Sequence, residues 1–157
     1  MSYSLDLDKE YFKFSSSHFT IFDKNQAEAL HGHNYHLSIS LEFETIDDSQ
    51  MAMEFSQVKS VVKKECELLD EKVLVPIESP FLKISKSSHY DGHTEVIYNE
   101  RHYVLPTNEL SLLPLKNITS EGLAQYMWAQ LSPKFPKADS VIVSIVETDG
   151  QSVSYTE

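Results

Sequence analysis

The clearest pattern along the chain is the alternation of apolar and polar residues over positions 35–44. Its apolar members are Leu37, Ile39, Leu41 and Phe43. A period of two is typical of a strand that buries one face. An aromatic-rich run at residues 9–19 predicts a second strand. We expect residues 20–30 to form the loop that joins the two strands into an antiparallel pair.

Two later segments have helical periodicity instead. Residues 55–69 place their apolar side chains on one stripe and their lysines off it. Residues 120–131 predict a second helix, with Thr119 as its N-cap and Glu121 in the first turn, where the helix dipole favours an acid.

The rest of the chain predicts shorter elements. Residues 141–147 predict a last long strand, and residues 152–155 are expected to pair back onto it. Residues 72–116 contain four prolines and are expected to be irregular, apart from a hairpin of residues 94–98 and 102–105. The predicted order is β-β-α-(hairpin)-α-β-β. We therefore expect one α+β domain over residues 1–157, with both helices on one face of an antiparallel sheet.

Charge and cysteine content narrow the function classes. A formal net charge of −11 argues against nucleic acid and anionic membrane as partners. The one cysteine, Cys66, cannot form an intramolecular disulfide, and we therefore expect a cytoplasmic protein. No apolar run reaches the ~18 residues of a membrane span. The first residues also lack the basic-then-apolar order of a signal peptide.

Three histidines carry the candidate chemistry. His31 and His33 are two residues apart, so on a strand they point to the same face. His18 ends the preceding aromatic run. Three imidazoles around an open fourth position are typical of catalytic zinc, although imidazole also suits iron, nickel and copper. The alternative interpretation is a polar His-Gly-His turn with an unrelated surface histidine.

Six short motifs follow one another along nearly the whole chain. They are FSSSH at 14–18, LHGHNY at 30–35, MEF at 53–55, LD at 69–70, NITSE at 117–121 and VET at 146–148. In this order they resemble the 6-pyruvoyl-tetrahydropterin synthase family, which also contains the 6-carboxytetrahydropterin synthases. The resemblance implies a tunnelling (T-) fold, zinc on His18, His31 and His33, a small-molecule pterin substrate, and a ring-shaped homo-oligomer, either a trimer or a hexamer.

One departure from the family pattern concerns the nucleophile. Members with the two best-known activities carry a catalytic cysteine shortly before His-Gly-His, where this chain has Asn25 and Ala27. Cys66 lies on the apolar stripe of the first predicted helix and is expected to be a core residue.

Glu28 lies three residues before His31 and resembles the Glu-x-x-His-Gly-His motif of a third subgroup. That subgroup cleaves 7,8-dihydroneopterin triphosphate to 6-hydroxymethyl-7,8-dihydropterin. The resemblance implies that Glu28 transfers a proton beside the metal, although an exposed loop carboxylate is the alternative. A 6-pyruvoyl- or 6-carboxy-type synthase acting on a related pterin, and a non-catalytic pterin-binding homologue, also remain open.

A second departure concerns the proton relay. The family usually has an Asp-His pair after the first helix, where this chain has Asp70 and Glu71. Both are candidates for proton transfer, although Asp70 also fits a plain helix C-terminus. The 72–116 segment is longer than in compact family members, and its histidines could enter the site instead: His89, His93 and His102.

Four further residues are candidates for holding the pterin. Glu147 can accept two parallel hydrogen bonds from the 2-amino group and N3–H of a pterin. Thr119 and Ser120 either touch the pterin or only cap the second helix. Phe55 either stacks near the site or packs in the core.

Overall fold

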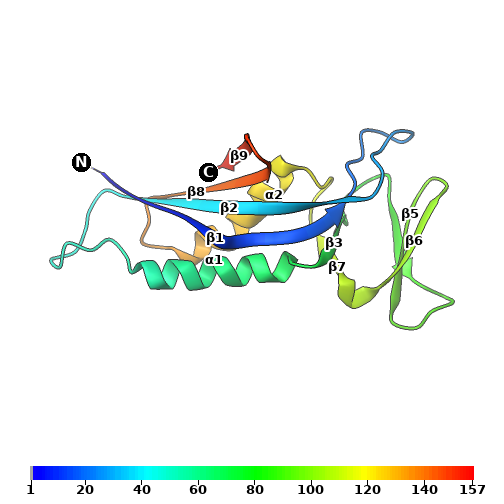
Figure 1. Cartoon of the computed structure of the whole chain (residues 1–157), viewed down its shortest axis with the longest axis horizontal. Helices are drawn as coiled ribbons and strands as arrows, with labels where there is room; N and C mark the ends of the chain where they lie inside the picture. The colour runs from blue at the N-terminus through cyan, green and yellow to red at the C-terminus, as the bar shows by residue number, and fades with distance from the viewer. Residues whose placement is uncertain (1) are drawn as a thin grey trace.

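The computed structural model describes residues 2–157 (Figure 1). The strands are β1 (Tyr3–His18), β2 (His31–Phe43), β3 (Lys72–Pro76), β4 (Lys83–Lys86), β5 (His93–Tyr98), β6 (Arg101–Pro106), β7 (Leu110–Leu113), β8 (Ser140–Thr148) and β9 (Gln151–Tyr155). The helices are α1 (Phe55–Leu69) and α2 (Ser120–Leu131), and two short 3₁₀ turns cover Thr107–Glu109 and Ser132–Lys134. Both α-helices have their predicted bounds.

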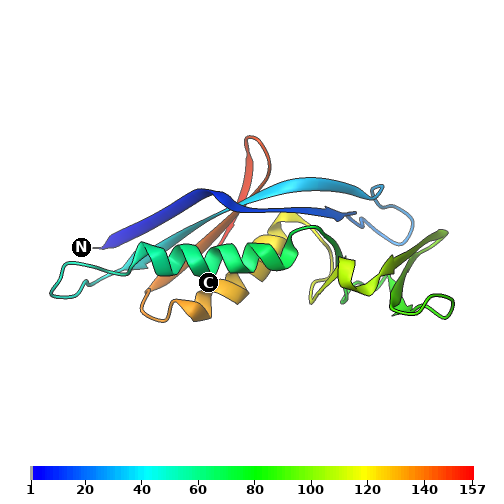
Figure 2. The same cartoon turned by 60° about the horizontal axis from the view of Figure 1, so that its bottom comes forward.

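Six strands form one sheet in the order β7-β3-β1-β2-β8-β9. Figure 2 shows this sheet curving over α1 and α2, which lie together on one face. The long pair β1 and β2 is antiparallel, with Phe14 opposite Tyr35 and His18 opposite His31. β8 runs antiparallel to β2, and β9 to β8. The predicted antiparallel arrangement of β1, β2, β8 and β9, with two helices on one face, is confirmed.

Two expectations about the elements were wrong. The first strand begins at Tyr3, not at residue 9, because pairing with β2 continues beyond an irregularity between Asp8 and Lys13. The 72–116 segment is not irregular, since it contains β3 to β7. β3 joins β1 in parallel and β7 joins β3 in parallel, so two short strands extend the sheet at one edge. These strands have only five and four residues and lie beside prolines, which hid them from a periodicity argument.

The predicted hairpin is confirmed as β5 and β6, and β4 adds a third strand to it. This small sheet lies beyond the end of the large sheet at which β1 ends (Figure 1).

The core fills the space between the helices and the curved sheet. Alternate residues of β2 from Tyr35 to Phe43 are buried there, as are Phe12 and Phe14 of β1. The rings of Phe14 and Tyr35 stack with centroids 5.0 Å apart. Thr119 caps α2, because its Oγ1 accepts a hydrogen bond of 3.1 Å from the backbone N–H of Gly122. Within residues 2–157, no helix is both long and apolar enough to span a membrane.

Candidate metal centre and ligand cavity

The three predicted histidines meet where β1 ends and β2 begins. His31 pairs with His18 across the strands, and His33 follows two residues later on the same face. Ring centroids are 4.7 Å apart for His18 and His31, 4.8 Å for His31 and His33, and 5.3 Å for His18 and His33. One nitrogen from each ring lies within 4.8 Å of the others. A group that could bind a metal ion is therefore present where the sequence predicted one.

The surroundings of the His18 side chain favour a bound cation among the three histidines. The side chain is buried, and its Nε2 has no hydrogen-bond partner within residues 2–157. Its Nδ1 lies 3.2 Å from the carbonyl oxygen of Ile118, and His31 Nδ1 lies 2.8 Å from that of Ala29. A ring that donates from Nδ1 to a carbonyl presents Nε2 as a lone pair, which is how histidine ligands are usually oriented. Burial and the neighbouring His31 lower the pKa of His18, which favours the neutral ring that a metal needs.

Glu147, near the end of β8, points its carboxylate at the histidines. Its Oε1 lies 3.4 Å from His33 Nε2 and 3.6 Å from His18 Nε2. Ser120 Oγ donates to Oε2 at 3.1 Å, and Tyr35 Oη donates to Oε1 at 3.4 Å. Burial and the adjacent Glu147 raise the pKa of Tyr35 well above its ordinary value, so the phenol remains a donor. The carboxylate is therefore held by two hydroxyl groups.

A cavity of about 660 Å³ opens beside this group. Its wall includes His31, His33 and Glu147, together with Thr119, the N-cap of α2, and Ser120, the first residue of that helix. The volume is in the range of small-molecule sites. The sequence thus predicted a set of residues that line one cavity.

Glu28 lines the same cavity from the loop between β1 and β2. Its Oε2 accepts a 3.1 Å hydrogen bond from the backbone N–H of Thr20 and lies 3.9 Å from His31 Nε2. Partial burial raises the pKa of Glu28, but the hydrogen bonds from Thr20 and the positive potential of His31 outweigh it, so the net pKa is below the ordinary value. The side chain is therefore a carboxylate at neutral pH.

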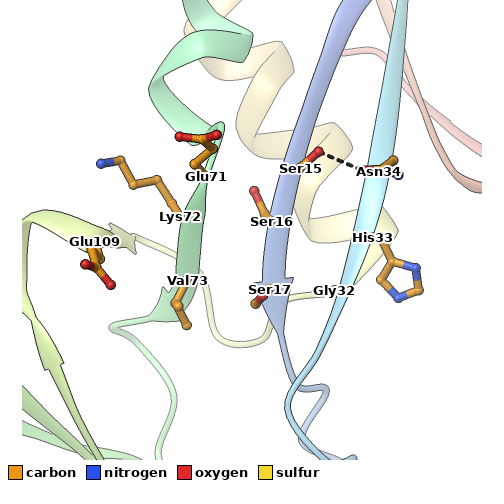
Figure 3. Close-up of a pocket in the computed structure, with 10 residues that line it drawn as sticks. All are labelled: Ser15, Ser16, Ser17, Gly32, His33, Asn34, Glu71, Lys72, Val73 and Glu109. Carbon is orange, nitrogen blue, oxygen red and sulfur yellow. Dashed lines mark hydrogen bonds between the residues drawn. The ribbon is translucent and has the colours of Figure 1, made fainter.

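Asp70 and Glu71 do not line the cavity that contains Glu28. Asp70 Oδ1 accepts a 2.7 Å hydrogen bond from the backbone N–H of Ser15 and so ties the end of α1 to β1. Glu71 lines a second cavity of about 370 Å³, which shares His33 with the first (Figure 3). In this second cavity the side chains of Ser15 and Asn34 are hydrogen-bonded. The ring of His33 extends away from Glu71 in that view. A single chain does not bring these two acids to the cavity that Glu28 lines.

The other candidates also lie outside the cavity that Glu28 lines. Phe55 is 52% exposed and does not line this cavity. It begins α1, whose first turn lies at the opposite end of the sheet from the end of β1 (Figure 1). His89, His93 and His102 belong to the segment that forms the small sheet, and none of them lines this cavity. Cys66 is buried in the core between helix and sheet, and burial raises the pKa of its thiol to about 12.

Sequence reasoning did not single out several residues at the site. They include Tyr35, Thr20 and Glu121, and residues 148 and 150–153 of the cavity wall. Tyr35 could have been found, because it lies two residues after His33 and so shares its face. Thr20 and Glu121 line the cavity only through the folding of the loop and the placement of α2.

The model of the 6-pyruvoyl tetrahydropterin synthase family matches residues 6–157, which is almost the whole chain. The chain belongs to this family. A Methanocaldococcus jannaschii protein provisionally named 6-carboxy-5,6,7,8-tetrahydropterin synthase is 28% identical over 151 residues, which cover 91% of this chain and 88% of that protein. The family is enzymatic and acts in pterin biosynthesis.

Solved structures support the same placement. The crystal structure of 6-pyruvoyl tetrahydropterin synthase from Plasmodium vivax has a TM-score of 0.91 and 25% identity, covering 100% of this chain and 98% of that one. A variant of the P. vivax synthase, in which a glutamate described as a catalytic residue is replaced by alanine, has the same TM-score and coverage at 24% identity. The predicted tunnelling fold is confirmed.

Proposed function

We propose that this chain is a zinc-dependent lyase that converts 7,8-dihydroneopterin triphosphate into 6-hydroxymethyl-7,8-dihydropterin. The observation that carries the proposal is Glu28, a carboxylate 3.9 Å from His31 Nε2 on the wall of the ligand cavity. The chain's single cysteine is buried elsewhere in the core. A carboxylate, not a thiolate, is therefore the base available at this position.

His18, His31 and His33 would hold the zinc ion. Zinc bound by three imidazoles acts as a Lewis acid that polarises hydroxyl and carbonyl oxygens of a bound substrate. The unpartnered, buried Nε2 of His18 supports a resident cation at this point. We assign zinc because three neutral imidazoles suit it, and because the family resemblance implies it.

Glu147 would hold the pterin ring. Its carboxylate can accept hydrogen bonds from the 2-amino group and N3–H of the pterin. Ser120 and Tyr35 fix the orientation of this carboxylate through their hydroxyl groups. Thr119 and Ser120 line the cavity at the start of α2. Thr119 also caps the helix, and Ser120 also donates a hydrogen bond to the Glu147 carboxylate.

Glu28 would move the proton. It accepts the proton of the hydroxyl on the second side-chain carbon, and that carbon becomes an aldehyde as its bond to the first carbon breaks. The electron pair of the broken bond passes to the C6=N5 imine of the dihydropterin. Glu28 then returns the proton to the first carbon, which leaves a hydroxymethyl group. The other product is a two-carbon aldehyde that still carries the triphosphate, so atoms and charge balance.

Binding of the triphosphate and the proposed relay by Asp70 and Glu71 would both depend on the assembly of several copies of the chain. No lysine or arginine of residues 2–157 lines the cavity, so one chain offers no cationic side chain for the triphosphate. A relay by Asp70 and Glu71 would likewise need their approach to the cavity of another copy. We therefore retain the homo-oligomer, a trimer or hexamer, as a proposal together with the cytoplasmic location.

A 6-carboxy-type synthase is the second candidate. The name of the M. jannaschii relative favours it. The absence of a cysteine from the loop before His31 argues against it, because thiolate chemistry is the usual route in that group. The two candidates differ in product, since only the lyase leaves a hydroxymethyl group at C6.

The test is an incubation of zinc-loaded protein with 7,8-dihydroneopterin triphosphate, followed by oxidation and chromatography of the fluorescent pterins. Wild type should yield 6-hydroxymethylpterin, and Glu28→Gln should lose this activity while keeping zinc and pterin binding. Glu42→Gln is the matched control, because Glu42 is an exposed acid of β2 away from the cavity. Full activity in Glu28→Gln would refute the mechanism. If the wild-type protein binds the pterin but does not turn it over, the chain is a non-catalytic pterin-binding protein.

A further inference from the structure

The tip of the β5–β6 hairpin is bonded to the loop that carries Glu28. Three hairpin side chains donate hydrogen bonds to backbone carbonyls of the 20–30 loop. The bonds are Tyr98 Oη to Asp23 O at 2.7 Å, Asn99 Nδ2 to Lys24 O at 2.6 Å, and Arg101 Nη2 to Ala27 O at 3.2 Å, while Arg101 Nη1 donates to Glu28 O. Two segments far apart in sequence are thus joined at four successive points along the loop.

Arg101 is the only arginine in the chain. Within residues 2–157 no carboxylate lies at ion-pair distance from it, and its guanidinium lies 5.7 Å from the centre of the Tyr98 ring. The planar fork of an arginine usually engages a carboxylate or phosphate with two parallel bonds. Here the fork engages the carbonyl oxygens of Ala27 and Glu28 instead, and the side chain is partly buried.

The loop itself holds Glu28 from the other side. The backbone N–H of Glu28 donates to Thr20 O at 2.9 Å, and the carboxylate accepts from Thr20 N at 3.1 Å. A bridge between Ile21 and Ala27 closes the loop one step further out. Phe19 stacks on Tyr103 of β6 with ring centroids 5.5 Å apart, so apolar contact joins the same two segments. The backbone of Glu28 therefore lies between Thr20 and Arg101.

We propose that Arg101 is a positioning residue for Glu28, and that the β5–β6 hairpin braces the loop so that the Glu28 carboxylate stays beside His31. This inference rests on the proposed function of Glu28 as the proton-transferring group. Displacing a catalytic base by about 1 Å can lower the catalytic rate roughly 100-fold, even when every reacting group is still present. The brace gives the 72–116 segment a role at the site, although none of its residues lines the cavity.

The experiment compares Arg101→Met with Arg101→Lys and with Lys83→Met, a control that removes an exposed cation from β4 of the same small sheet. Hydrogen–deuterium exchange is measured on peptides covering the 20–30 loop, and kcat, KM and zinc content are measured on the same zinc-loaded samples. In Arg101→Met we expect loop exchange to accelerate at least ~10-fold and kcat to fall about 10- to 100-fold, with KM and zinc content unchanged. Arg101→Lys should restore part of both, and Lys83→Met should match wild type.

Three outcomes would overturn the proposal: unchanged loop exchange in Arg101→Met, a faster loop with unchanged kcat, or a loss that appears in KM or zinc content instead of kcat. If Arg101→Met does not fold, Tyr98→Phe removes one bond of the same brace and keeps the ring, with a smaller acceleration of loop exchange expected. If wild type itself does not turn over the pterin, the proposed function fails, and the exchange data alone then decide whether Arg101 holds the loop.

Discussion

Replacing Glu147 by glutamine tests the assignment of the pterin anchor. The two side chains have nearly the same shape, and Ser120 can still donate to the remaining carbonyl oxygen of the amide. The amide nitrogen is a donor, however, and it would face a donor of the pterin. One accepted hydrogen bond and the negative charge are lost together.

The expected magnitude follows from that single bond. A hydrogen bond to a charged group contributes about 1.5–3 kcal/mol. Each 1.36 kcal/mol is tenfold in an equilibrium or rate constant, so kcat/KM should fall about 10- to 150-fold. Because the anchor is proposed to hold the ring and not to react, most of the loss should appear in KM.

The assay measures steady-state turnover of 7,8-dihydroneopterin triphosphate together with zinc per chain by elemental analysis. Zinc content should equal that of wild type. Loss of zinc in Glu147→Gln would show that this carboxylate, 3.4 Å from His33 Nε2, is a metal ligand instead of the pterin anchor. An unchanged KM with full zinc would refute both roles.

Three further predictions concern residues around the site and in the core. Tyr35→Phe removes the phenol that donates to Glu147, and KM should rise by about 2- to 10-fold with little change in kcat; an unchanged KM would show that Ser120 alone orients the carboxylate. Cys66→Ala should keep full turnover, and the native thiol, with its pKa raised to about 12, should react with Ellman's reagent at pH 8 only after unfolding; rapid reaction of the folded protein would contradict its burial. Lys134→Met should lower the free energy of unfolding by about 1–2 kcal/mol in urea titrations, because it leaves the buried Glu65 carboxylate without the 2.7 Å ion pair, discounted for the partial exposure of Lys134. An unchanged urea midpoint would show that this ion pair does not stabilise the folded state.

Much of the fold could be predicted because its signals are local. The alternation around Leu37 and Ile39 and the apolar stripe of α1 each depend on neighbours within one element. β3 and β7 could not be predicted in the same way. Their parallel pairing with β1 joins Ser16 to Lys72 and Val73 to Leu110, which depends on contacts between distant segments and not on a periodic run.

The candidate site divides in the same manner. The three histidines were predictable, because two of them follow strand periodicity and the motifs place the third. The position of Glu71 was not predictable, since only the register of β3 against β1 puts it on a different cavity from Glu28. Arg101 gave no local signal, because its partners Ala27 and Glu28 are backbone carbonyls more than seventy residues earlier.

The most direct test of the account is the zinc content of untagged protein, measured for wild type and for His18→Ala after the same purification. We expect one zinc ion per chain in wild type and a large loss in the variant, because His18 supplies a buried Nε2 that has no hydrogen-bond partner within residues 2–157. Protein without a bound transition metal, or a variant that keeps its full zinc content, would contradict the metal centre on which the proposed chemistry depends.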